Sequence, residues 1–161
     1  MKSLTHQDQV AELLESYNPE VLLDAVRRIN ERNLLDRAKI GSPSDTIDYL
    51  RDYLQGQTRE LFVVIFLDTR HRVIACETLF KGTIDGACVY PRIVAERALK
   101  LNAAAVILAH NHPSGESEPS LADQAITRRL KDSLSLLEVR LLDHFVIGAG
   151  EPVSFACRGL L

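Results

Sequence analysis

The chain has 161 residues, of which 46% are hydrophobic and 25% are charged. At about 150 residues per domain, this length predicts one globular domain with a short appendage. The composition excludes intrinsic disorder and collagen-like or coiled-coil architectures. The net charge of −3 does not favour a sequence-independent phosphate-binding surface, which needs clustered Lys and Arg side chains.

Membrane insertion and disulfide formation are not expected. The longest purely aliphatic run, residues 103–109, is far shorter than the ~20 residues that cross a bilayer, and residues 1–8 lack the apolar stretch of a signal peptide. The cysteines are odd in number and have no C-x-x-C spacing: Cys76, Cys88 and Cys157. We therefore expect a soluble cytoplasmic protein whose reduced thiols lie in its core.

The first part of the chain has helical periodicity. Apolar residues recur at helical spacing between Gln7 and Arg37 and predict a helical N-terminal extension over residues 1–41. A further helix is predicted from Ser44 through Leu54, with Gly56 as its C-cap glycine.

The period then changes to one typical of strands. Residues 61–67 are a continuous β-prone run that turns back into residues 73–76, so the two predict a hairpin with a buried strand. The remaining predicted elements are a helix from Pro91 to Leu101, a central strand at 104–109, an amphipathic helix at 121–137, and strand segments at 139–142 and 144–147. This mixture predicts an α/β or α+β domain over residues 42–161.

Two histidines follow the predicted central strand directly. His110 and His112 are two residues apart, so in an extended chain their side chains project from the same face. Asp123 lies in the first turn of the following helix and supplies a third, oxygen ligand. A His₂/carboxylate set leaves one tetrahedral position open for water, as catalytic zinc sites do. The sequence therefore predicts a metal site at His110, His112 and Asp123.

Ser120 and Asp123 also fit a plainer interpretation. Ser-x-x-Asp ahead of an apolar helical run is an ordinary N-cap with an acidic first turn. The two histidines are harder to explain in this way, because buried imidazole nitrogens without partners are costly.

The spacing His110-x-His112, seven residues, then Ser120-x-x-Asp123 resembles the JAMM motif of the JAB/MPN metalloprotease superfamily. The wider string from His110 to Gly115, together with Pro119-Ser120, looks like the bacterial RadC branch of that superfamily. The resemblance covers about residues 42–161. It implies a three-layer α/β domain of the JAB1/MPN-like, cytidine-deaminase-like kind, with a mixed central sheet.

The resemblance also implies roles for the site residues. Zn²⁺ held by His110, His112 and Asp123 would lower the pKa of a bound water toward ~7 and polarise the carbonyl of a peptide or isopeptide bond. A glutamate would take the proton from that water and deliver it to the leaving amine. Ser120 would donate a hydrogen bond to the developing oxyanion.

The sequence leaves the identity of this glutamate open. In the superfamily it lies at the start of the first core strand, which favours Glu60, directly before residues 61–67. Glu77, at the predicted end of the second hairpin strand, is the main rival, followed by Glu116 and Glu118. Periodicity does not separate Glu60 from Glu77.

Other expectations concern neighbouring residues and partners. Asp143 and His144 fit either a hydrogen-bonded core pair or support of the metal site.

The main functional expectation is a zinc metallopeptidase acting on a peptide or protein. The alternative is a DNA-repair-associated accessory protein without proteolytic activity, as the RadC resemblance implies. Zinc-dependent deamination is disfavoured because the P-C-x-x-C element is missing. The oligomeric state, with a homodimer as one option, is left open.

Overall fold

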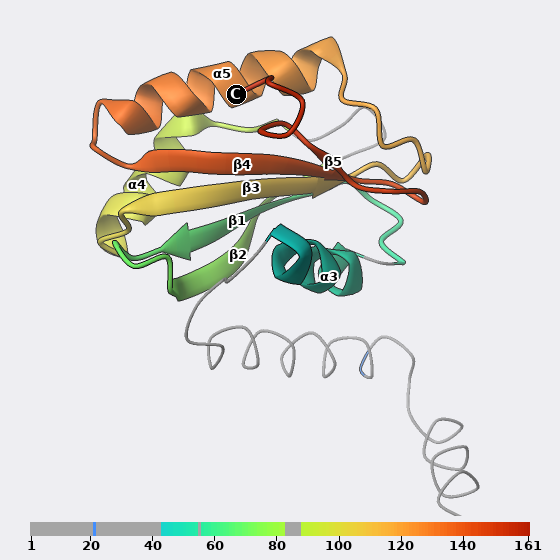
Figure 1. Ribbon diagram of the computed structural model, residues 1–161, viewed down its shortest axis with the longest axis horizontal. Coiled ribbons are helices and arrows are strands. Elements are labelled where there is room, and N and C mark those ends of the chain that lie inside the picture. Colours follow the sequence, from blue (N-terminus) through green and yellow to red (C-terminus); the bar gives the residue numbers. More distant parts are fainter. Residues whose placement is uncertain (1–20, 22–42, 55, 83–87) are drawn as a thin grey trace, which may run out of the picture.

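The computed structural model describes residue 21 and residues 43–54, 56–82 and 88–161. The predicted helical extension of residues 1–41 therefore lies almost entirely outside the described residues, and its boundary at residue 42 stays a prediction. The elements of the described part, coloured along the chain in Figure 1, are α3 (Pro43–Leu54), β1 (Leu61–Leu67), β2 (Val73–Lys81), α4 (Pro91–Lys100), β3 (Ala105–Asn111), α5 (Leu121–Ser135), β4 (Arg140–Ile147) and β5 (Val153–Ser154).

The strands form one mixed sheet in the order β2-β1-β3-β4-β5. β1 runs antiparallel to both β2 and β3, β3 and β4 are parallel, and β5 is antiparallel to β4. The predicted α/β class and mixed sheet are confirmed. The parallel β3–β4 pair is joined through α5, as parallel pairs require a crossover connection.

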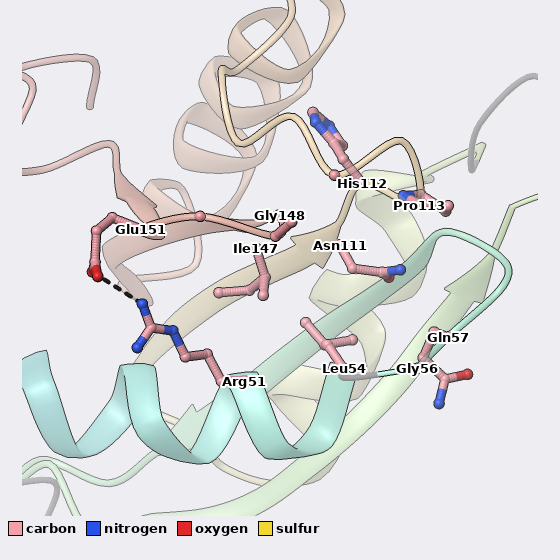
Figure 2. Close-up of a pocket in the computed structure, with 13 residues that line it drawn as sticks. Arg51, Leu54, Gly56, Gln57, Asn111, His112, Pro113, Ile147, Gly148 and Glu151 are labelled. Atoms are coloured by element: carbon pink, nitrogen blue, oxygen red, sulfur yellow. Dashed lines mark hydrogen bonds and ion pairs between the residues drawn. The ribbon is translucent and has the colours of Figure 1, made fainter.

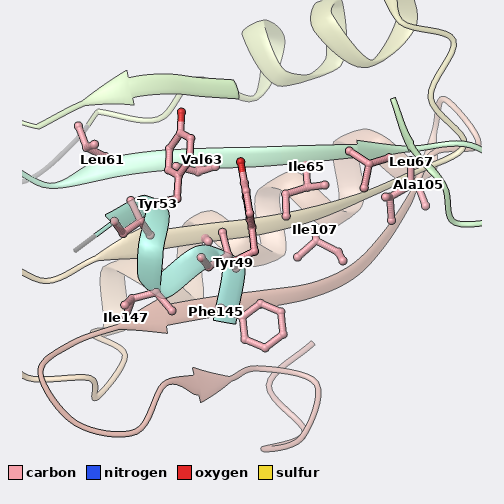
Figure 3. Close-up of a cluster of buried hydrophobic side chains, with 14 residues drawn as sticks. Tyr49, Tyr53, Leu61, Val63, Ile65, Leu67, Ala105, Ile107, Phe145 and Ile147 are labelled. Carbon is pink, nitrogen blue, oxygen red and sulfur yellow. The ribbon is translucent and has the colours of Figure 1, made fainter. Parts of the chain in front are cut away.

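Helices cover both faces of the sheet, α3 on one face and α4 with α5 on the other (Figure 1). Because side chains alternate along a strand, β1 supplies both layers of the core. Leu61, Val63, Ile65 and Leu67 pack with α3 (Figure 3), and the residues between them pack with α4 and α5. Every residue of β1 is buried, which explains the unbroken apolar run in its sequence.

Two strands differ from their predicted lengths. β2 continues to Lys81 instead of ending at residue 76, because its polar residues find partners on the flanking helices: Arg97 of α4 bonds Glu77, and Tyr53 of α3 bonds Thr78. β4 is one strand rather than two segments, because the carboxylate of Asp143 is satisfied by β5 and the residues after it. The two-residue β5 is too short to give a periodic signal.

The cysteines are not core residues. Cys88 and Cys157 are exposed and Cys76 is half-buried, so the prediction of buried thiols is wrong for the first two. Both of these lie outside regular strands and helices, where periodicity gives no indication of burial. The helices that the structure describes are too short or too polar to cross a bilayer.

Two loops pack closely where β3 and β4 end. The His112 N–H donates to the Ile147 carbonyl (2.9 Å), and the Ala149 N–H donates to the Gly115 carbonyl (2.8 Å). A Cβ atom on Gly148 would lie 2.4 Å from the Gly115 carbonyl oxygen and 2.5 Å from Ser117 Oγ. The contact therefore requires glycine at position 148.

We expect Gly148→Ala to lower the free energy of unfolding by about 1–3 kcal/mol, the usual cost of forcing extra atoms into a packed region. Urea unfolding measures this change. Gly150→Ala is the matched control, because no atom lies within 4 Å of a Cβ atom at that position. Equal stabilities of the two variants would contradict the predicted steric clash.

Candidate metal centre

His110 and His112 occupy the end of β3, where the sheet meets the N-terminus of α5. His110 is the penultimate residue of the strand and its side chain is only 1% exposed, while His112 directly follows the strand and its side chain is 17% exposed. Phe62 of β1 stacks on the His110 ring. The buried strand thus holds one imidazole inside the core and the other at its surface.

Asp123 joins the two histidines from the first turn of α5. Its Oδ1 lies 3.3 Å from Nε2 of His110 and its Oδ2 lies 3.5 Å from Nε2 of His112, while the two Nε2 atoms are 2.9 Å apart. One ligand atom from each residue lies within 4.8 Å of the others. The structure therefore brings together all three predicted ligands in a group that could hold a metal ion.

The outer nitrogens of both histidines are already engaged. Nδ1 of His112 bonds the Glu116 carbonyl (2.7 Å), and Nδ1 of His110 lies 2.8 Å from Nε2 of His144. Metal-binding histidines nearly always have such a partner, which orients the ring and directs the other nitrogen at the metal. Two imidazole nitrogens and one carboxylate form a donor set that suits zinc.

Electrostatics in this cluster favour an ionised Asp123. Burial alone would raise the pKa of the Asp123 carboxyl, but the adjacent imidazoles of His110 and His112, and a hydrogen bond from Ser120, hold that pKa well below its usual range. The hydrogen bond to Asp123 in turn raises the pKa of His112, despite partial burial, and Glu60 adds to this effect through its charge. The carboxylate is thus ready to bind a cation at any ordinary pH.

His144 and Asp143 have different roles in the structure. His144 is fully buried, and burial lowers its pKa well below the ordinary value. Its Nδ1 lies 2.6 Å from Oγ1 of Thr127, and its Nε2 contacts a predicted ligand. Asp143 instead bonds the Ser154 hydroxyl and the Ala156 N–H, so it holds the C-terminal segment. Of the two, His144 contacts the candidate metal ligand His110.

The two main glutamate candidates lie in different surroundings. In the β1–β3 register Phe62 pairs with His110, and the same register continued by two residues places Glu60 opposite His112. Glu77 pairs with Val64, further along the sheet, and both of its carboxylate oxygens bond the Arg97 guanidinium (2.6 and 2.7 Å).

The contacts of the two loop glutamates do not direct their carboxylates at the histidines. Glu118 bonds Arg158 with both carboxylate oxygens. Glu116 offers its main-chain carbonyl to His112. The geometry favours Glu60 as the proton carrier, and that role stays a prediction.

Ser120 is the N-cap of α5 and forms a capping box with Asp123. Its hydroxyl donates to Asp123 Oδ2 (2.7 Å) and accepts from the Asp123 N–H (3.0 Å), and the Ser120 N–H also donates to Oδ2 (2.7 Å). The capping interpretation is therefore confirmed. The oxyanion role is an additional prediction. It requires the Ser120 hydroxyl to donate to the substrate instead of to Asp123.

The sequence matches the family model of the RadC-like JAB domain over residues 40–160. The chain belongs to the RadC-like JAB domain family. Relatives include UPF0758 proteins of Vibrio cholerae serotype O1 (57% identical over 143 residues), Stutzerimonas stutzeri (55% over 141) and Stenotrophomonas maltophilia (62% over 120). The matches cover 86%, 85% and 74% of this chain, but only 64%, 63% and 51% of those relatives.

Two residues of this RadC-like JAB domain contribute to the site without having been predicted. Thr127 lies one helical turn after Asp123. This i, i+4 spacing could have indicated that the two side chains lie on the same face of the helix. Asn111 lies between the two histidines and projects from the opposite face of β3. Its side chain accepts from the Leu61 N–H (2.8 Å) and donates to the Arg59 carbonyl (3.0 Å), so it holds the main chain on both sides of residue 60.

A cavity of about 760 Å³ adjoins the predicted ligand His112 (Figure 2). It lies between α3 and the loops that follow β3 and β4, with Leu54 and Ile147 among its lining residues. An ion pair between Arg51 and Glu151 (3.0 Å) lies at the end away from His112. The cavity thus lies on the α3 side of the sheet, and His112 is the one member of the candidate metal group among its lining residues.

We expect the domain to bind one divalent cation per chain, with an affinity that decreases as the pH falls. The metal must displace the proton of His112, whose pKa is raised above the ordinary value of about 6.5. As the pH is lowered, the metal affinity should therefore begin to fall at a pH above 6.5. One displaced proton gives a fall of up to about tenfold per pH unit. Zn²⁺ titration against a chromophoric chelator from pH 5 to 9 measures this dependence.

His112→Ala removes a predicted ligand near the surface and should abolish stoichiometric binding. His71→Asn is the matched control, because His71 lies in the β1–β2 turn, where its positive φ of 59° suits asparagine. Stoichiometric metal in His112→Ala, or an affinity that is independent of pH, would contradict the predicted site.

Proposed function

We propose that this domain is a zinc-dependent hydrolase that cleaves peptide or isopeptide bonds. The convergence of His110, His112 and Asp123, with the Nε2 atoms of both histidines next to the carboxylate, carries the proposal. Membership of the RadC-like JAB domain family supports it, because the JAB superfamily includes metalloproteases. The DNA-repair-associated alternative has no comparable geometric support among the described residues.

His110, His112 and Asp123 would hold the zinc ion and, as three protein ligands, would leave its fourth position open. Zinc in such a set supplies a Lewis acid and lowers the pKa of a water molecule at its open position. Within the proposed reaction, Glu60 accepts the proton of the attacking water on a carboxylate oxygen and passes it to the leaving amine. This role needs a glutamate that is beside the metal without being a ligand, as the register of β1 against β3 implies for Glu60.

Asn111 supports this assignment of Glu60. Its amide bonds the main chain of both neighbours of Glu60, at Arg59 and Leu61, and its side chain is buried. The start of β1 is therefore anchored to the strand that carries the histidines. A general base must be held within hydrogen-bond reach of its proton donor, and this anchor restricts its movement.

Ser120 is proposed to donate a hydrogen bond to the oxyanion that develops on the substrate carbonyl. Its hydroxyl lies within 2.7 Å of the carboxylate of Asp123, so it is next to the metal centre.

The test of this function is zinc-dependent cleavage by the intact chain. The probe is an internally quenched peptide library that includes lysine ε-linked isopeptides. We expect cleavage by zinc-loaded protein and none by the chelator-treated protein or by His112→Ala. If zinc-loaded protein cleaves none of these probes, hydrolysis of this bond class is the wrong function.

We predict that Glu60→Gln keeps stoichiometric zinc and loses about 10²–10⁴-fold in cleavage rate, the usual contribution of a general acid–base. The amide keeps the size of the side chain but cannot accept the proton. Metal analysis and the cleavage assay on the same preparation measure the two quantities.

Glu77→Gln is the control for this substitution, because its carboxylate bonds Arg97 and should not take part in the reaction. It should cleave at close to the wild-type rate. An active Glu60→Gln beside an inactive, zinc-loaded Glu77→Gln would transfer the role to Glu77.

Ser120 substitutions separate capping from catalysis. Ser120→Gly keeps a tolerated N-cap, so it should lose only a few tenths of a kcal/mol of stability, whereas Ser120→Ala should lose about 0.5–2 kcal/mol. Both remove the hydroxyl and should lower the rate by about 10²–10³-fold, the effect of deleting one oxyanion donor. Thermal unfolding and the cleavage assay measure the two effects.

Ser120→Thr keeps both the cap and the hydroxyl, and should behave like the wild type in both assays. Zinc content is determined for every variant, because Ser120 also bonds the ligand Asp123. A zinc-loaded Ser120→Gly with the wild-type rate would limit Ser120 to capping.

A further inference from the structure

A chain of buried hydrogen bonds begins behind His110 and returns to Asp123. Nδ1 of His110 lies 2.8 Å from Nε2 of His144, and Nδ1 of His144 lies 2.6 Å from Oγ1 of Thr127. The Thr127 hydroxyl donates to the main-chain carbonyl of Asp123 (2.6 Å). Both His144 and Thr127 are at most 1% exposed, so this chain is shielded from water.

The hydroxyl of Thr127 determines the direction of the whole chain. A hydroxyl has one proton to donate, and here the Asp123 carbonyl receives it. Oγ1 can therefore act towards His144 only as an acceptor, so Nδ1 of His144 must carry a proton.

The next bond follows from the neutrality of His144. Its ring nitrogens contact Thr127 and His110, neither of which is an anion, and a buried imidazolium without an anionic partner is costly. A neutral imidazole with a proton on Nδ1 has a lone pair on Nε2. Nδ1 of His110 must then be the donor to His144.

We propose that Thr127 and His144 are positioning residues that keep a proton on Nδ1 of His110 and so leave Nε2 as the nitrogen that binds the metal. This inference rests on the metal site of the proposed function, but not on peptide hydrolysis. Which nitrogen of a histidine binds a metal is set by the hydrogen bond of the other nitrogen.

The reverse direction of the chain would be incompatible with metal binding. If His144 donated from Nε2, His110 would accept on Nδ1 and, as a neutral ring, carry its proton on Nε2, beside Nε2 of His112 (2.9 Å) and Oδ1 of Asp123 (3.3 Å). That proton would occupy the position of the metal. The Thr127 hydroxyl excludes this arrangement, and it is anchored on the same residue that supplies the carboxylate ligand.

Thr127→Val and Thr127→Ser form the matched pair for the test. Valine keeps the shape of threonine but has no hydroxyl, so either nitrogen of His144 is then free to carry the proton. Serine keeps the hydroxyl and the direction of the chain. A threonine with a merely structural role would affect unfolding in these variants, but not the tautomer of His110.

The first readout is the imidazole ¹⁵N NMR spectrum of the metal-free protein at alkaline pH, where the rings are neutral. We expect His110 to carry its proton on Nδ1 in the wild type and in Thr127→Ser, and to show a mixture of tautomers in Thr127→Val. The wild-type spectrum tests the direction of the chain by itself, even if Thr127→Val does not fold.

The second readout is Zn²⁺ affinity by chelator competition. Thr127→Val should bind about 10–100-fold more weakly, as is typical when the partner of a ligating histidine is lost, and Thr127→Ser should match the wild type. A wild-type His110 with its proton on Nε2, or a Thr127→Val that equals Thr127→Ser in both tautomer and affinity, would overturn the proposal. A correct tautomer in a protein that cleaves no peptide would refute only the proposed function.

Discussion

The burial of His110 is the constraint on which the site depends. An imidazole that is 1% exposed at the end of a core strand must satisfy both of its nitrogens inside the protein, because neither can reach bulk water. One nitrogen meets His144, and through it Thr127 and α5. The other faces His112 and the carboxylate of Asp123. Burial of the ring therefore determines which of its nitrogens can bind a cation.

Asp123 links the stability of α5 to the chemistry of the site. Its carboxylate accepts from both the N–H and the hydroxyl of Ser120, which satisfies groups at the helix N-terminus, and it also lies within 3.5 Å of Nε2 of both histidines. The positive end of the helix dipole also stabilises a carboxylate in this position. The cap therefore holds the candidate ligand Asp123 next to the end of β3, so we expect any change of the cap to alter the candidate metal site as well.

The sheet topology decides which of the two glutamates lies near the candidate metal site. Because β1 runs antiparallel to β3, the start of β1 meets the end of β3, and residue 60 comes beside the histidines. Asn111 strengthens this arrangement by bonding the main chain at residues 59 and 61. Glu77 lies one strand further out, on β2, and its carboxylate is bound by Arg97 of α4. Proximity to the histidines separates the two glutamates, and it is not visible in a one-dimensional pattern.

The sequence by itself determined the local features of this protein. Apolar periodicity predicted β1, α3 and α4 within a residue or two, and the spacing of His110, His112 and Asp123 predicted a metal site, because these patterns reflect contacts within one element or between consecutive ones. The tertiary structure alone decided the pairings between distant elements. It extended β2 through polar residues that two helices satisfy, and it exposed Cys88 and Cys157. It also separated Glu60 from Glu77 and placed His144 and Thr127 behind the candidate ligand His110. Such pairings depend on strand order and on helix placement across the sheet, which a linear pattern of residues does not encode.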